Sequence, residues 1–225
     1  MLLHGYIVSA EDTWIGSGIA GRLAEEGRRV IVPDLRAHGA SARSHDPAAY
    51  PPEVLTDDGL ALVDHLGLED YDLGGYSVGG RIVARMLIRG ARPGRAIVAA
   101  TGLEPILQAV GRGDKYRPLL ADYGAATLKP DPAAKRDIVA YLRSVDADPV
   151  ALTLFLDSFV NTPLADLEAI ETPTLVVAGE EESLGSVENL AAALPRSTLR
   201  RVPGDHSTAL LSPEFTDALL RFLRD

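Results

Sequence analysis

The chain has 225 residues, of which 46% are hydrophobic and 24% are charged, a balance typical of a globular protein with one sizeable core. Its formal net charge of −10 argues against nucleic acid or an anionic membrane as a partner, and the absence of cysteine excludes disulfides, thiolate metal ligands and a cysteine nucleophile. The first residues do not resemble a signal peptide, and no run approaches the roughly 18 apolar residues that cross a bilayer, so we expect a cytoplasmic protein.

Short apolar runs bounded by turn residues recur along the chain, and their length favours strands of a parallel sheet covered on both faces. These runs are 1–3, 29–33, 71–75, 96–100, 174–179 and 198–202. Stretches with helical spacing separate most of them, at 15–23, 54–66, 82–87, 190–194 and, after the last run, 215–222. The alternation predicts an α/β domain with a mostly parallel sheet of about six strands and helices on both faces.

One segment breaks this alternation. Residues 103–171 are mostly helical in pattern, most clearly at 129–145 and 149–160. We expect residues 1–102 and 172–225 to form the core and residues 103–171 to be a small helical cap over the ligand crevice.

A lone serine flanked by glycines lies between a predicted strand and a predicted helix, in Gly75-Tyr76-Ser77-Val78-Gly79. An ordinary strand-to-helix turn is one interpretation. The other is a sharp turn that exposes a nucleophilic hydroxyl, because a Gly-x-Ser-x-Gly sequence in this setting has that geometry in hydrolases.

A nucleophilic serine needs a base and an acid that orients the base. His206 follows the last predicted strand in a Gly-Asp-His turn, although a surface histidine capping the last helix would fit that position equally well. Glu180, Glu181 and Glu182 follow the preceding strand, where a run of acids can also be a solvated loop.

With these residues in this order, the chain resembles the α/β-hydrolase superfamily, in the branch of small esterase-like and haloperoxidase-like enzymes. Five segments carry the resemblance, in the family's order: "LLHGY" (2–6), "VIVPDLRAHGAS" (30–41), "GGYSVGG" (74–80), "TPTLVVAGEEE" (172–182) and "VPGDH" (202–206). They cover nearly the whole chain outside the expected cap.

The resemblance implies a role for each matching residue. Ser77 would be the nucleophile, His206 the general base and Glu182 the acid, while the backbone N–H groups of Tyr6 and Val78 would form the oxyanion hole. Most relatives carry aspartate at the position of the acid. No metal or cofactor is implied.

Other acids remain alternatives for that role. Glu180, Glu181 and Asp205 are fallbacks, and Glu104 is a lesser candidate because some relatives place an acid after the preceding strand.

A serine nucleophile implies acyl transfer to water, and it argues against the carboxylate-nucleophile chemistry of haloalkane dehalogenases and epoxide hydrolases. We expect a small or medium carboxylic ester as substrate. Five residues are candidates for contacting it: Tyr76, Arg81, Leu103, Phe155 and Phe159. Packing of the cap onto the core is the alternative role for the last three.

Two other functions stay open. "GYSVGGR" is similar to the corresponding turn of the menaquinone-pathway synthase, a lyase that acts on an anionic cyclohexene carboxylate, where the residues matching Tyr76 and Arg81 serve the anionic substrate. A relative that binds a ligand with little turnover is the third reading.

The chain also departs from its relatives, which usually carry two further strands before the "LLHG" segment. Residues 29–33 would then be an exposed apolar edge of the sheet. Such an edge invites pairing with another chain, so we expect self-association or lower stability.

Overall fold

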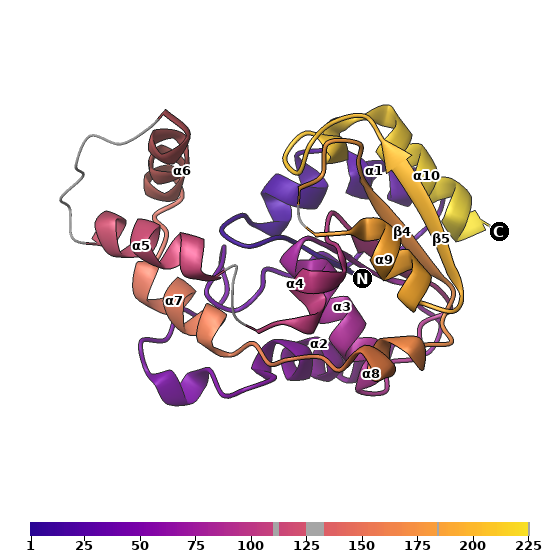
Figure 1. Cartoon of the computed structure of the whole chain (residues 1–225), viewed down its shortest axis with the longest axis horizontal. Coiled ribbons are helices and arrows are strands. Elements are labelled where there is room, and N and C mark those ends of the chain that lie inside the picture. Colours follow the sequence, from indigo (N-terminus) through magenta and orange to yellow (C-terminus); the bar gives the residue numbers. More distant parts are fainter. Residues whose placement is uncertain (110–112, 125–132, 184, 225) are drawn as a thin grey trace.

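The computed structural model describes residues 1–109, 113–124, 133–183 and 185–224 (Figure 1). At the centre of this described part is a parallel sheet of five strands in the spatial order β1-β2-β3-β4-β5. The strands are β1 (Leu2–Leu3), β2 (Leu73–Tyr76), β3 (Ala96–Ala99), β4 (Thr174–Gly179) and β5 (Ser197–Val202). All pairings are parallel, so the carboxyl ends of the strands share one edge of the sheet.

The expected strand at 29–33 is not formed, which corrects the predicted number of strands. This segment runs beside β1 and is joined to it by the Leu2 N–H, which donates to the Ile31 carbonyl at 2.8 Å. The ladder cannot extend far because β1 has only two residues, and Pro33 has no N–H to offer.

Helices cover both faces of the sheet, as the alternation predicts. α1 (Ile19–Glu25) and α10 (Pro213–Arg224) contact each other, and α10 lies against β4 and β5. On the other face α3 (Val78–Ile88) contacts the first three strands, α9 (Val187–Ala193) contacts β4 and β5, and α2 (Val54–His65) lies against α3.

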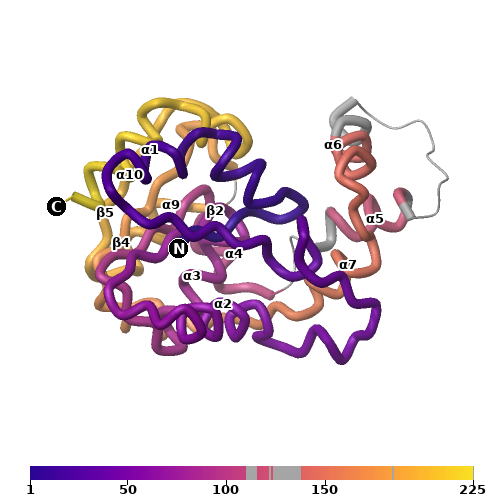
Figure 2. The backbone as a smooth tube through the Cα atoms, turned by 180° about the vertical axis from the view of Figure 1, so that it is seen from behind, coloured from indigo at the N-terminus to yellow at the C-terminus, as the bar shows by residue number. Residues whose placement is uncertain are grey.

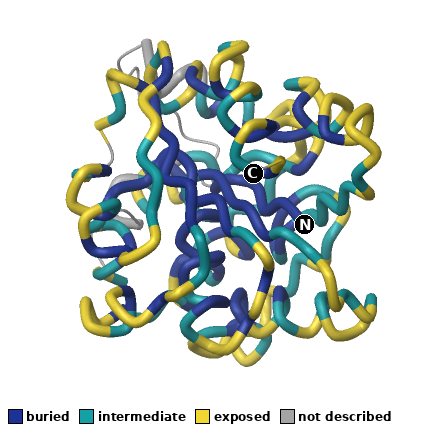
Figure 3. Tube along the Cα trace, turned by 90° about the vertical axis from the view of Figure 1, so that its right-hand side faces the viewer, coloured by how far each residue is buried: buried dark blue, intermediate teal, exposed yellow. Residues whose placement is uncertain are grey.

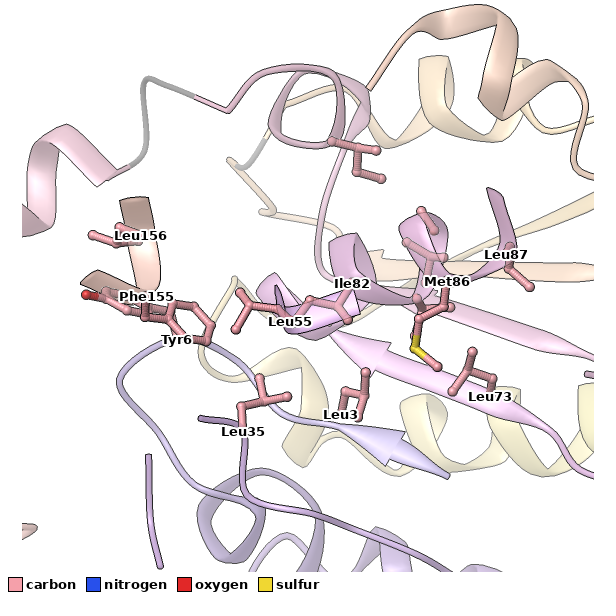
Figure 4. Close-up of a cluster of buried hydrophobic side chains, with 14 of the residues drawn as sticks. Leu3, Tyr6, Leu35, Leu55, Leu73, Ile82, Met86, Leu87, Phe155 and Leu156 are labelled. Carbon is pink, nitrogen blue, oxygen red and sulfur yellow. The ribbon is translucent and has the colours of Figure 1, made fainter. Parts of the chain in front are cut away.

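Strand residues alternate between the two apolar clusters on these faces. In β3, Ala96 and Val98 belong to the cluster with α3, while Ile97 and Ala99 belong to the cluster with α1 and α10. Side chains of a strand point to opposite faces in turn, and here both sides are apolar because both are covered. Figure 3 shows the strands as a buried centre, and Figure 4 shows side chains of the first cluster.

Within residues 103–171 the described helices divide into two groups. α5 (Gly113–Gly124), α6 (Ala133–Ser144) and α7 (Pro149–Asp157) stand to one side of the sheet in both Figure 1 and Figure 2. The short helices α4 (Leu103–Leu107) and α8 (Leu164–Glu168) lie instead against α3 and α9. We use "cap" below for α5–α7. In the part of the chain that the structure describes, no helix has the length and apolar character needed to cross a membrane.

Candidate active site

Ser77 occupies a strained turn between β2 and α3. Its backbone has φ 54° and ψ −112°, in a region that non-glycine residues rarely adopt. The Ser77 N–H donates to the Ala99 carbonyl at 2.8 Å, so the neighbouring strand holds the turn in place. The side chain therefore stands at the carboxyl edge of the sheet, half-buried.

Two glycines make this turn sterically feasible. A Cβ atom at Gly75 would lie 2.1 Å from the Gly79 carbonyl carbon, and one at Gly79 would lie 2.2 Å from the Leu3 oxygen. Both contacts are with backbone, which cannot rotate away as a side chain can. The glycines therefore allow α3 to start directly against β1 and β2.

His206 and Glu182, which are far apart in sequence, are in contact. The His206 Nδ1 lies 2.8 Å from the Glu182 Oε2, and the glutamate side chain is fully buried. A carboxylate at Nδ1 favours the tautomer that carries its proton there, which leaves Nε2 as an acceptor. Glu180 and Glu181 are exposed.

The fallback acids have other partners. Asp205 Oδ1 accepts the N–H groups of Ser207 and Thr208, both at 2.9 Å, and so stiffens the loop that carries His206. Glu104 Oε2 accepts the Ser186 N–H at 2.9 Å, which ties α4 to the loop after β4.

The loop after β1, which contains Tyr6, is held by two buried histidines. The His4 Nε2 accepts the Leu35 N–H at 2.8 Å, and the His38 Nε2 accepts the Ile7 N–H at 3.1 Å. A nitrogen that accepts an N–H bond carries no proton, so both rings are neutral. Burial lowers the pKa of each, that of His38 to about 3.

Ser77, His206, Tyr6 and Val78 line one pocket of about 420 Å³. Seven residues between β3 and β4 line it, and most of them are apolar: Thr101, Pro105, Ala109, Tyr116, Ile138, Leu156 and Phe159.

The predicted substrate-contacting residues divide in two. Tyr76, Arg81 and Phe159 line the pocket. Phe155 is fully buried and stacks on Tyr6 at 5.6 Å (Figure 4), and Leu103 packs against the core, so neither lines it, in contrast to our expectation.

Among the described residues, Arg81 donates to main-chain carbonyls rather than to an acidic side chain. The residue is 7% exposed, and its guanidinium donates to the carbonyls of Pro105 (2.9 Å), Gln108 (2.8 Å) and Val160 (2.7 Å). It also lies 4.4 Å from the centre of the Phe159 ring, a cation–π contact. Burial lowers its pKa to about 10.

Sequence reasoning missed several lining residues. Asp12 and Thr13 belong to a π-helical turn, η1 (Glu11–Ile15), which no periodicity predicts. Tyr116 and Ile138 lie on cap helices, where an apolar residue that faces a pocket looks the same in sequence as one that faces the core.

Comparisons with known proteins bear on the family and the fold. The sequence profile of the alpha/beta hydrolase fold family matches residues 1–134. A non-heme haloperoxidase from Rhodococcus erythropolis is 25% identical over 257 residues, which cover 99% of this chain and 91% of that protein.

Two solved structures show the same fold. A bromoperoxidase from Bacillus anthracis superposes with a TM-score of 0.72 at 24% identity, over 100% of this chain and 91% of that one. A thermophilic esterase from Thermogutta terrifontis gives 0.71 at 24% identity, over 99% of this chain and 88% of that one.

Proposed function

The chain belongs to the alpha/beta hydrolase fold family, and from that premise we propose that it is a serine hydrolase that cleaves a small or medium carboxylic ester through Ser77, His206 and Glu182. One observation carries the proposal: the imidazole that lines the pocket with Ser77 is held at Nδ1 by a buried carboxylate, 2.8 Å away. Relatives named as esterases and haloperoxidases support hydrolase activity in general.

The proposed reaction passes through an acyl-enzyme. Ser77 Oγ attacks the ester carbonyl while His206 Nε2 takes its proton, and the imidazolium then protonates the departing alkoxide. The negative charge on the tetrahedral intermediate faces the N–H groups of Tyr6 and Val78, and the charge of Glu182 stabilises the imidazolium. Water, activated by His206, then releases the acid and restores the serine.

The pocket supports the size class of the substrate. Its volume is about 420 Å³, and apolar cap residues such as Ile138 and Leu156 line it. Sites of this size and character bind small organic molecules by burying their apolar part.

The proposal is tested with p-nitrophenyl esters of increasing acyl length. Wild type is expected to hydrolyse them, and Ser77→Ala to lose more than about a thousandfold in kcat, because the nucleophile is gone. Ser144→Ala, in the exposed face of α6, is the matched control with the same chemical change. A Ser77→Ala variant that keeps the wild-type rate contradicts the proposal.

The acid is tested by one substitution at three neighbouring positions. Glu182→Gln is expected to lower kcat by about a hundredfold or more, because the imidazole loses its charged partner. Glu180→Gln and Glu181→Gln change the same group on the exposed loop and are expected to keep the rate. Equal losses at all three positions would contradict the assignment to Glu182.

Arg81 favours a second candidate, chemistry on an anionic substrate. It is a buried cation that lines the pocket, and its hydrogen-bond partners among the described residues are neutral carbonyls. A bound carboxylate would offset the cost of burying that charge. A lyase acting on a cyclic carboxylate would be inhibited by small carboxylates, and a ligand-binding relative would be saturated by them. Both would hydrolyse neutral esters poorly.

A further inference from the structure

Tyr76 connects the strand that precedes Ser77 to the loop that carries His206. It is the last residue of β2, one peptide bond before Ser77, and its hydroxyl donates to the backbone carbonyl of His206 at 2.8 Å. We propose that Tyr76 is a positioning residue that fixes the His206 main chain relative to Ser77, rather than a substrate-binding residue. The inference rests on the proposed function and adds a part to the same site.

The tyrosine ring is itself held on several sides. The side chain is 5% exposed, and its ring centre lies 5.8 Å from that of Phe215 and 6.3 Å from that of Trp14, which meets it edge to face. The His206 ring is 5.9 Å away. Because a phenol on two rotatable bonds has few ways to move in such packing, the link from residue 76 to residue 206 has a nearly constant length.

The hydroxyl stays protonated and can therefore always donate. Burial raises the pKa of Tyr76, and the negative charges of Glu182 and Asp205 raise it further. The acceptor is a carbonyl, so the bond does not depend on the protonation state of the imidazole.

Among the described residues, the other hydrogen bonds of the His206 loop do not connect it to β2, the strand that precedes Ser77. The bonds of Asp205 lie within the loop itself, and the Glu181 N–H, which donates to the Gly204 carbonyl at 3.1 Å, joins the loop to the end of β4. Glu182 orients the ring from Nδ1. The Tyr76 hydroxyl joins the loop to the strand that leads into the nucleophile. This bond would therefore help to fix the distance between Ser77 and His206.

The test is Tyr76→Phe, which keeps the ring and its packing and removes only the donor. We expect kcat to fall by roughly tenfold to a hundredfold, because small misplacement of a catalytic group has effects of this order, and KM to stay within about twofold. The loss is expected to be equal for acetate, butyrate and octanoate esters. Tyr123→Phe, which removes a hydroxyl that donates to the Leu142 carbonyl inside the cap, is the matched control.

Three outcomes would overturn the inference while leaving the proposed function intact. They are an unchanged kcat, a rise in KM without a fall in kcat, and a loss that depends on acyl length, which would show contact with the substrate. Near-ultraviolet circular dichroism of the variant checks that its packing is native.

A second readout separates the inference from the proposed function. A small fluorophosphonate labels an activated serine without needing an acyl pocket, and we expect Tyr76→Phe to slow labelling of Ser77 by the same factor as kcat. Equal labelling rates would overturn the positioning role. A wild type that neither hydrolyses esters nor is labelled at Ser77 would contradict the proposed function itself.

Discussion

At the scale of single residues, two histidines outside the proposed catalytic group have a structural role that requires their rings to be neutral. His4 and His38 each accept a backbone N–H at Nε2, and each places Nδ1 within hydrogen-bond distance of a carbonyl, of Gly5 at 2.7 Å and of Arg36 at 2.8 Å. Protonation at Nε2 would break these bonds, which hold the loop after β1. Their rings are in contact, with centres 5.1 Å apart, so charges on both would also repel.

We predict that stability falls with pH below about 6.5. The folded state holds the pKa of His38 at about 3, below its ordinary value of 6.5, so the unfolded chain takes up the proton first. Stability is therefore complete above 6.5 and is lost progressively between 6.5 and 3. At pH 5 the loss from this residue is about 2 kcal/mol, measured as the free energy of unfolding in urea at pH 7 and pH 5.

The control is His38→Gln, whose amide oxygen can still accept the Ile7 N–H but does not titrate. The variant is expected to show a smaller difference between pH 7 and pH 5. Asp12 and Asp34 have pKa values below their usual 3.8, so their contributions begin to be lost only near pH 3.8, below the measurement at pH 5. The same pH dependence in both proteins would contradict the role assigned to His38.

The candidate site residues were predictable from the sequence to different degrees. The order of Ser77, acid and His206 along the chain, with the glycines around the serine, was enough to propose them. The choice of Glu182 among three consecutive glutamates rested on the family resemblance alone, because their chemistry is the same and only the turn after β4 decides which one reaches His206. The bond from the Tyr76 hydroxyl depends on the fold of a loop 130 residues away.

At the scale of elements, the junction of β2 and α3 tolerates no added atoms at its centre. We predict that Gly79→Ala destabilises the protein by at least about 2 kcal/mol, as overpacking of a tight core does, because the new Cβ would lie 2.2 Å from the Leu3 oxygen. Gly21→Ala in α1 is the control, since a Cβ there meets nothing within 4 Å. It is expected to stabilise by about 0.5–1 kcal/mol through helix propensity.

Thermal and urea unfolding of the two variants measure this difference. A folded Gly79→Ala protein with unchanged stability would mean that α3 can shift away from β1. In that case the position of Ser77 would not depend on the close approach described above.

Most elements were predictable because their apolar patterns are local. Strands β2 to β5 and the helices α2, α9 and α10 coincide with apolar patterns that can be recognised in the sequence. Residues 29–33 have the same apolar character, but whether they form a strand depends on the length of β1, which pattern alone does not reveal. Part of the expected helix at 129–145 lies outside the described residues, and α6 forms the described part up to Ser144.

At the scale of the whole molecule, the two edges of the sheet differ. β5 exposes Arg200 and Arg201, charges that discourage further pairing. The opposite edge strand is β1, and residues 29–33 run beside it without forming a strand. Val30, Ile31 and Val32 in this edge segment are half-buried, and Val30 and Ile31 line a second cavity of about 420 Å³.

We propose that this apolar edge pairs with the same edge of a second copy. The average mass in static light scattering is then expected to rise with protein concentration. Val30→Lys is expected to restore the monomer, because a charge on an exposed edge segment blocks pairing, whereas Thr198→Lys on β5 serves as the control. A monodisperse monomer throughout the concentration series would contradict the proposal.

The attachment of the cap has a consequence for how such a protein can diversify. Arg81 holds the segments on both sides of α5–α7 through main-chain oxygens, which every amino acid supplies. Mutations that alter the side chains of the cap therefore leave the acceptors of this anchor in place. The cap sequence can therefore change during evolution while Arg81 keeps its hydrogen bonds to the main chain on either side of the cap.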